Sequence, residues 1–408
     1  MTEIESKVTL VASLEPPIEI LRLRCAKCLT CVRSCPFEAI FYDDENKIAI
    51  DLNKCQLCGI CAGVCPEYNI EIKYYNTKAL VEHIRDEKEK LGTDDLVVMC
   101  RGSSPQSCEI LDVLKEQNIE KFIPLRLPCV GRIPVEFYLQ AMYQGLKNII
   151  IVQCDENFCR MERGSEVSQK NVMRSSEILK TLGFEDGTIQ IIKNPQKALY
   201  FTEECVGCDK CSFICPYDAI ELEELSTPRI VLEKCNGCGA CALVCPHMAI
   251  QLRGFEFKSS SQAIQNYQAS PEKMKSEGAT SAVLVFCCQW SEFSALDKTQ
   301  CEASDNAQIV EVPCANGLDP SLVLGALSGG FDGVIAFICS EEDCKSKEGR
   351  GTYDANASAM LNVLKNLDLL DRFEMHVISP RDPGNFNSKL VSFVEKIRSQ
   401  SEQTKKGE

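Results

Sequence analysis

Residues 25–36 read CAKCLTCVRSCP, and the spacing of their cysteines decides the fold. Two residues separate each of the first three cysteines, three residues separate the third from the fourth, and proline follows. The pattern returns at residues 55–66, 205–216 and 235–246, offset by 30 residues within each pair and by 180 between pairs. Three runs continue as Pro-x-x-Ala-Ile, whereas the second reads Pro66-Glu67-Tyr68-Asn69-Ile70. The chain therefore contains an internal duplication of one unit.

This spacing is typical of the ligands of [4Fe–4S] clusters. Three thiolates two residues apart wrap one face of the cube, and the fourth, ahead of proline, ligates the neighbouring cluster. The pattern resembles that of bacterial-type 2[4Fe–4S] ferredoxins and predicts two such modules with four clusters. Zinc knuckles are the alternative, but zinc would leave the third and fourth cysteine of each run without a role. The predicted ligand sets are Cys25, Cys28, Cys31 and Cys65; Cys55, Cys58, Cys61 and Cys35; Cys205, Cys208, Cys211 and Cys245; and Cys235, Cys238, Cys241 and Cys215.

Composition bounds the possible functions. The 408 residues include 27 cysteines and carry a formal net charge of −15. No basic stretch followed by an apolar one opens the sequence at Met1, so we expect no secretory signal and a cytoplasmic location. Cytoplasmic thiols stay reduced and serve as metal ligands or buried side chains. Clustered Lys and Arg are missing, which argues against nucleic-acid binding, and the apolar runs are too short for membrane insertion.

A second set of cysteines follows each pair of these runs. Most of these cysteines come directly after short apolar stretches rich in branched residues, such as 95–99 and 149–153. Stretches with a helical pattern, such as 135–145, follow the cysteines. This alternation predicts an open parallel sheet with helices on its faces, and a further helix is expected over 77–91. The cysteines concerned are Cys100, Cys129, Cys154 and Cys159 in the first copy, and Cys287, Cys314, Cys339 and Cys344 in the second.

Strand-end cysteines of such a sheet meet at one edge, because ligands bind outside the carboxyl ends of parallel strands. We therefore expect each group of four to hold a [2Fe–2S] cluster. The competing interpretation, that these cysteines are small buried hydrophobic residues, explains one of them more easily than eight in matching register. Of the three remaining cysteines, Cys288 is an alternative to Cys287, Cys108 is a spare ligand and Cys301 is an ordinary residue.

These modules resemble the delta subunit of the methyl-viologen-reducing hydrogenase. The second copy matches in Phe286-Cys287-Cys288-Gln289-Trp290-Ser291, Val312-Pro313-Cys314 and Ile338-Cys339-x4-Cys344, and the first in Met99-Cys100, Leu127-Pro128-Cys129 and Val152-Gln153-Cys154-x4-Cys159. Ser291 stands where that family usually carries a further cysteine, and the first copy lacks the tryptophan motif. The resemblance implies an electron conduit within a larger complex. Its implied partners are a flavin-containing heterodisulfide-reductase-like subunit and a hydrogenase, formate dehydrogenase or similar donor.

Together these patterns predict α+β ferredoxin modules alternating with α/β open parallel-sheet modules, in a duplicated architecture. We expect a non-catalytic subunit of an oxidoreductase complex that relays single electrons through four [4Fe–4S] and two [2Fe–2S] clusters. The alternative is a flavin-binding reductase subunit that acts on a small substrate, although no Gly-x-Gly-x-x-Gly follows a predicted strand. The expected limits are 1–75 and 201–256 for the ferredoxin domains, 76–200 and 281–397 for the hydrogenase-delta-like domains, 257–280 for a linker and 398–408 for a polar tail.

Overall fold

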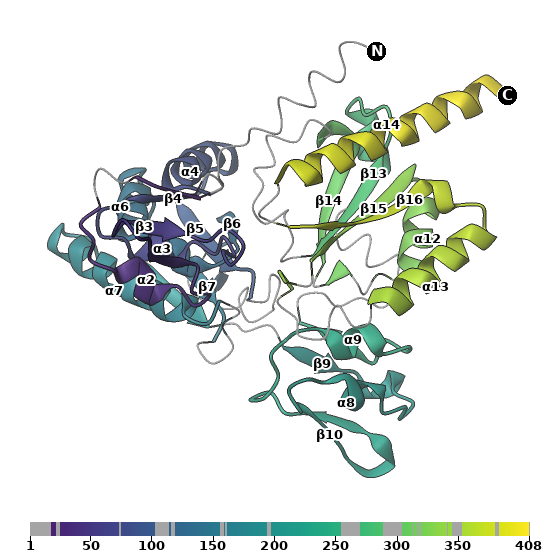
Figure 1. Cartoon of the computed structure of the whole chain (residues 1–408), viewed down its shortest axis with the longest axis horizontal. Coiled ribbons are helices and arrows are strands. Elements are labelled where there is room, and N and C mark those ends of the chain that lie inside the picture. Colours follow the sequence, from purple (N-terminus) through teal and green to yellow (C-terminus); the bar gives the residue numbers. More distant parts are fainter. Residues whose placement is uncertain are drawn as a thin grey trace. The chain divides into compact units, whose positions relative to one another are not determined.

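The computed structural model divides into two compact units, Met1–Gln196 and Lys197–Glu408 (Figure 1). Each unit contains a small region with two four-cysteine runs and a larger region with a four-stranded parallel sheet. The predicted duplication, mixed α/β content and parallel sheets are confirmed. The structure describes residues 18–21, 25–72, 75–102, 114–115, 119–155, 159, 161–193, 197–253, 270–288, 304–312, 314–315, 318, 320–340, 342–344, 353–379 and 383–407.

The small region of each unit consists of two antiparallel strand pairs and two short helices that contact each other. The first strand of the region pairs with the last, so the two four-cysteine runs lie back to back around one small core. In the first unit the elements are β1 (Ile18–Ile20) with β4 (Ile70–Ile72), β2 (Ile40–Tyr42) with β3 (Ile48–Ile50), α2 (Thr30–Ser34) and α3 (Ile60–Val64). In the second they are β9 (Ala198–Tyr200) with β12 (Ile250–Leu252), β10 (Ile220–Leu222) with β11 (Pro228–Ile230), α8 (Lys210–Ile214) and α9 (Ala240–Val244).

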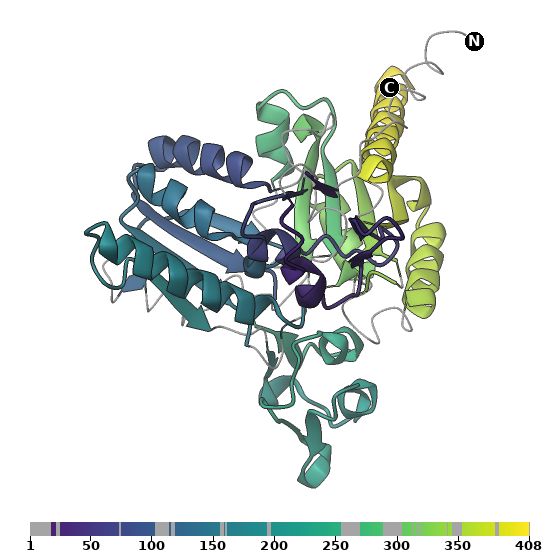
Figure 2. The same ribbon diagram turned by 60° about the vertical axis from the view of Figure 1, so that its left-hand side comes forward.

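The larger region of the first unit has the parallel strand order β6-β5-β7-β8. Figure 2 shows α4, α6 and α7 along one face of this sheet, where Ile84, Phe137 and Val172 share a core with Leu96 and Val98. The strand order reverses between β5 and β7, and in open parallel sheets ligands bind at such a reversal. The elements are α4 (Thr77–Leu91), β5 (Asp95–Cys100), β6 (Ile123–Leu127), η2 (Val130–Arg132), α6 (Val135–Tyr143), β7 (Asn148–Gln153), α7 (Gly164–Thr181) and β8 (Ile189–Lys193).

The larger region of the second unit repeats this order as β14-β13-β15-β16. One face of its sheet is covered by the last helix, α14, whose Phe386, Leu390 and Phe393 pack on Val285 and Phe337. The elements are β13 (Val283–Cys288), β14 (Ala307–Val312), α12 (Pro320–Ser328), β15 (Gly333–Cys339), α13 (Tyr353–Asn366), β16 (Phe373–Ile378) and α14 (Pro383–Gly407).

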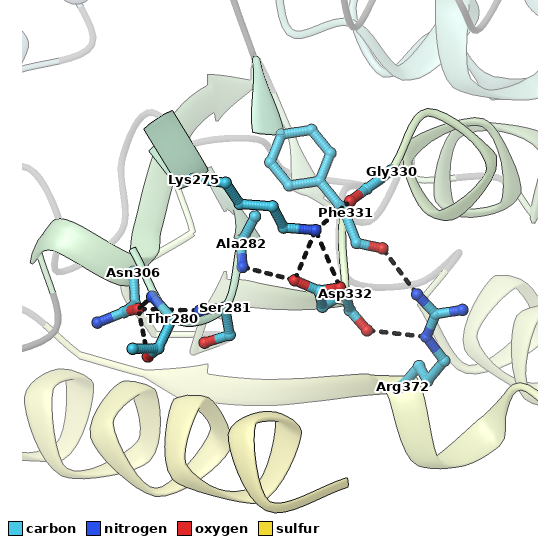
Figure 3. A network of polar contacts seen from close by, with 9 residues as sticks. All are labelled: Lys275, Thr280, Ser281, Ala282, Asn306, Gly330, Phe331, Asp332 and Arg372. Carbon is cyan, nitrogen blue, oxygen red and sulfur yellow. Dashed lines mark hydrogen bonds and ion pairs between the residues drawn. The ribbon is translucent and has the colours of Figure 1, made fainter. Parts of the chain in front are cut away.

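A polar network joins the amino ends of these strands (Figure 3). The Asp332 carboxylate accepts hydrogen bonds from Lys275 Nζ (3.2 Å) and from the backbone N–H of Ala282 (2.8 Å). Arg372 Nε donates to the backbone oxygen of Asp332 (2.8 Å). Asn306 Oδ1 accepts from backbone N–H groups just before β13. The network anchors the end of the sheet opposite the cysteines, which leaves the carboxyl ends for the site.

Three elements lie at or near the expected domain limits. Within the predicted linker, residues 271–276 form α11 (Pro271–Ser276), which contacts the second sheet region through Lys275, whereas 257–269 lie outside the described residues. α14 continues to Gly407, through the predicted polar tail. β9 starts at Ala198 and pairs within the second small region. None of the described helices combines the length and apolar character that crossing a bilayer requires.

Candidate metal centres

The small regions gather their cysteines around cavities. Within the described residues no group of three or more Cys, His, Asp or Glu is arranged to hold a single metal ion. Instead, four thiols surround each hollow, three from one run and the fourth from the other. The sets that line a common cavity are Cys25, Cys28, Cys31 and Cys65; Cys205, Cys208, Cys211 and Cys245; and Cys215, Cys235, Cys238 and Cys241.

The remaining predicted set is brought together as well. Burial raises the pKa of Cys61, and the neighbouring charges of Cys58, Cys55 and Cys35 raise it further. Burial likewise raises the pKa of Cys58 to about 12, with Cys55 and Cys35 again among the causes. Four thiolates this close in a buried place repel one another, so they need a cationic group between them.

The backbone around these cavities is shaped to face negatively charged sulfur. Each Cys-x2-Cys-x2-Cys loop has two residues with positive φ at matching positions. Backbone that alternates between right- and left-handed conformations forms concave rows of N–H groups. Such concave arrangements of N–H groups bind anions and are common at iron–sulfur sites. Glycine is expected at such positions, yet Lys27, Leu29, Leu57 and Asp209 also adopt this conformation, at a cost in strain. The residues are Lys27, Leu29, Leu57, Gly59, Gly207, Asp209, Gly237 and Gly239, with φ between 48° and 84°.

In three of the four runs the fourth cysteine accepts a backbone hydrogen bond from the residue four positions later. Ala39 N–H donates to Cys35 Sγ (3.4 Å), Asn69 N–H to Cys65 Sγ (3.3 Å) and Ala219 N–H to Cys215 Sγ (3.3 Å). A donor aimed at sulfur stabilises the thiolate form, which is the form that binds metal.

At the carboxyl edge of the first parallel sheet, the four cysteines predicted from strand ends meet. Cys154 lies within hydrogen-bonding reach of both Cys100 and Cys159, and the pKa of Cys154 is raised mainly by these contacts. Cys129 and Cys159 converge on Gly164, the first residue of α7: a Cβ there would lie 2.3 Å from Cys129 Sγ and 3.4 Å from Cys159 Sγ. The structure therefore unites residues from β5, β6, β7 and the following loop.

Helix α7 begins at this site, so the positive end of its dipole faces the sulfurs. The pKa of Cys159 is lowered to about 6, first by its contact with Cys154 and then by hydrogen bonds that include the Ser165 backbone. Ser165 Oγ also contacts Cys154 Sγ at 3.3 Å. Burial instead raises the pKa of Cys129, which is 1 % exposed. The site thus combines thiolate-stabilising donors with a closed, apolar setting.

The second sheet places Cys288 rather than Cys287 at its site. Hydrogen bonding with Cys288 and Cys344, together with burial, raises the pKa of Cys339, so these three thiols lie together. Cys287 lies in the core beneath α14, with Val285 and Phe337. Successive residues of a strand point to opposite faces, and the register agrees: Cys288 pairs with Val312 as Cys100 pairs with Leu127. The structure therefore brings Cys288, the alternative, together with Cys339 and Cys344, and places Cys287 in the core. Cys314 is buried at the end of β14, whereas Cys108, Cys301 and Ser291 lie outside the described residues.

In the first unit the small region packs tightly on the sheet region through three glycines. A Cβ on Gly63 in α3 would lie 2.1 Å from the backbone oxygen of Gly131, and one on Gly131 would lie 2.5 Å from that of Gly164. Asn171 of α7 bridges the two regions, donating from Nδ2 to the backbone oxygens of Gly63 (2.7 Å) and Ile133 (2.9 Å). α3 carries Cys61 and η2 follows Cys129, so this contact brings the two sulfur sites close together.

Arg132 occupies the gap between those two sites. It is 5 % exposed, its guanidinium carbon lies 5.5 Å from the centre of the Tyr75 ring, and its Cβ lies 2.6 Å from where a Cβ on Gly59 would be. Burial lowers the pKa of Arg132, whereas the charges of Tyr75, Cys58 and Cys129 act to raise it. Sequence inspection did not single out this residue, because only the tertiary contact reveals its position.

Paired four-cysteine runs on such loops, each cavity enclosed by four thiols, define an iron–sulfur electron-transfer protein. The model of the 4Fe-4S dicluster domain matches residues 24–75 and 204–255. The model of the methyl-viologen-reducing hydrogenase delta subunit matches residues 96–199 and 283–400, which is more than half of the chain. The chain belongs to this delta-subunit family and carries its module twice.

Curated relatives agree with both halves of this description. Over 215 residues the chain is 28 % identical to a subunit of the ferredoxin:CoB-CoM heterodisulfide reductase of Methanosarcina mazei; the match covers 52 % of this chain and 26 % of that protein. Over 120 residues it is 31 % identical to the iron-sulfur subunit of the F420-non-reducing hydrogenase of Archaeoglobus profundus, covering 28 % of this chain and 88 % of that protein. The chain therefore matches only about a quarter of the reductase subunit but nearly all of the hydrogenase subunit.

Proposed function

We propose that this chain is the electron relay of a larger redox complex, with four [4Fe–4S] clusters in its ferredoxin modules and a [2Fe–2S] cluster in each α/β module. The modules alternate along the chain as ferredoxin, α/β, ferredoxin, α/β. A bound cluster supplies a centre that takes up and releases one electron at a time. The observation that carries the proposal is that three cysteines of one run and the fourth cysteine of the other line a common cavity, on loops with positive φ at matching positions.

The eight cysteines of the α/β modules support the smaller cluster. Cys100, Cys129, Cys154 and Cys159 lie together at a buried sheet edge. In the second module we assign the ligands as Cys288, Cys314, Cys339 and Cys344. Thiolate ligands suit iron–sulfur centres, and the amides of Gly102 and Ser165 stabilise the charge that such a centre carries.

The protein contributes to the relay in two ways: it sets the distance between neighbouring sites, and it places charge beside them. The Gly63–Gly131–Gly164 contact holds a ferredoxin site against an α/β site, and Arg132 places a buried cation between them. A buried positive charge favours whichever form of its neighbour is more negative, which here is the reduced form.

The partners we propose are those that the resemblance to the delta-subunit family implies. One is a flavin-containing subunit like those of heterodisulfide reductases; the other is a hydrogenase, formate dehydrogenase or similar donor. Anaerobic purification from the native source, followed by identification of the bound subunits, tests this assignment. A reductase-type subunit together with a dehydrogenase-type subunit is the expected result. Purification of the chain alone, with flavin released from it by acid, would instead support a flavin-binding reductase.

A further inference from the structure

Asn69 breaks a pattern that the other three cysteine runs share. Ala39, Ala219 and Ala249 stand at the matching position, and all four residues are buried, at 1–2 % exposure. Their backbones behave alike: the oxygen of Asn69 accepts from Leu21 N–H (2.7 Å), as that of Ala249 accepts from Phe201 N–H (2.8 Å). The substitution therefore adds a buried amide without changing the local fold.

The side chain of Asn69 has no hydrogen-bond partner among the described residues. Neither Nδ2 nor Oδ1 makes a hydrogen bond, although both atoms are shielded from water. Burying an amide in this way is costly, so such groups are normally satisfied by a partner, and an exception points to a ligand. Asn69 also lines the cavity enclosed by Cys25, Cys28, Cys31 and Cys65. The missing partner is therefore expected inside that cavity.

We propose that Asn69 Nδ2 donates a hydrogen bond to sulfur of the cluster held by Cys25, Cys28, Cys31 and Cys65, and thereby raises the reduction potential of that cluster. The inference rests on the proposed function, because it requires a cluster in this cavity. Hydrogen bonds to cluster sulfur are among the features that set iron–sulfur potentials. The donor acts most strongly on the reduced form, whose sulfur carries more negative charge. Asn69 thus distinguishes this centre from the other three of its type.

The second ferredoxin module offers a matched reverse experiment. Ala249 occupies the equivalent position and lines the cavity of Cys205, Cys208, Cys211 and Cys245. Ala249→Asn should create the same donor there, whereas Asn69→Ala restores the residue found in the other three runs. Because alanine is native at those positions, Asn69→Ala is expected to fold and to bind iron normally.

The test uses the full chain, prepared anaerobically and titrated potentiometrically while low-temperature electron paramagnetic resonance is recorded. Asn69→Ala should lower the reduction potential of one component of the spectrum. The expected change is at least tenfold in the one-electron equilibrium constant, which corresponds to 59 mV. Ala249→Asn should shift a different component upward.

Three outcomes separate the possibilities. A wild-type chain without iron–sulfur signals would refute the proposed function itself. Normal iron content with unchanged potentials in both Asn69→Ala and Ala249→Asn would overturn the role of Asn69 alone. Loss of iron from Asn69→Ala without a shift in the remaining components would show that the amide is structural, which also overturns the inference.

Discussion

Gly164 is the position where one added carbon should do most harm to the first α/β site. An alanine Cβ there would lie 2.3 Å from Cys129 Sγ and 3.4 Å from Cys159 Sγ. Cys129 is buried between β6 and η2, so its thiol can yield only by turning away from the other three. Overpacking of this kind costs about 2 kcal/mol. If that cost falls on the cluster-bound state of the chain, Gly164→Ala should weaken binding of the cluster about 30-fold.

The loss of the cluster is followed by measuring iron per chain while the protein is incubated with a chelator under anaerobic conditions. Gly164→Ala should lose about two irons early, the content of one [2Fe–2S] centre, while the ferredoxin modules keep theirs. Gly183→Ala is the control: its φ of 91° disfavours alanine, but no atom of the described residues lies within 4 Å of the added Cβ. Strain there costs roughly 1–2 kcal/mol without moving a thiol. Equal iron retention in Gly164→Ala and wild type, or equal loss in Gly183→Ala, would refute the reasoning.

Three further changes test the other ligands and contacts. Cys288→Ala should remove about two irons, whereas Cys287→Ala should cost only about 1 kcal/mol of stability; equal iron loss in an iron assay would contradict the assigned strand faces. Gly63→Ala brings a methyl group within 2.1 Å of the Gly131 oxygen and should loosen the packing of the first ferredoxin module by about 1–3 kcal/mol. Faster amide hydrogen exchange in α3 and η2 measures that loosening, and unchanged exchange would count against the contact. Arg132→Gln should lower the potential of the adjacent ferredoxin cluster, with Arg132→Lys restoring part of it; a redox titration that shows no shift would remove Arg132 from the relay.

Local signals in the sequence predicted much of the first sheet region. The helix expected over 77–91 is confirmed, because Asn76 Oδ1 caps its first turn by accepting from Ala79 N–H (2.9 Å) and Gly92 ends it with positive φ. The strands before Cys100 and Cys154 also follow the expected apolar runs. Capping residues and branched apolar runs act over a few neighbours, so they can be read without knowing the fold.

The features that escaped prediction depend on pairing between distant segments. The fourth strand of each parallel sheet, β8 or β16, lies at the sheet edge. No predicted ligand cysteine follows either strand, so the cysteine pattern could not predict them. The choice between Cys287 and Cys288 depends on which face of β13 meets the site, and only the register with β14 decides it. Arg132 and the glycine contact arise where two modules meet, which no local pattern announces.

The central claim is that cysteines from separate segments hold six iron–sulfur centres on one chain. Iron analysis of the anaerobically prepared full chain, combined with electron paramagnetic resonance after reduction by dithionite, tests it most directly. We expect roughly 20 irons per chain, whereas about 16 would leave both α/β modules without a cluster. A colourless, zinc-loaded chain without a paramagnetic signal would contradict the claim altogether.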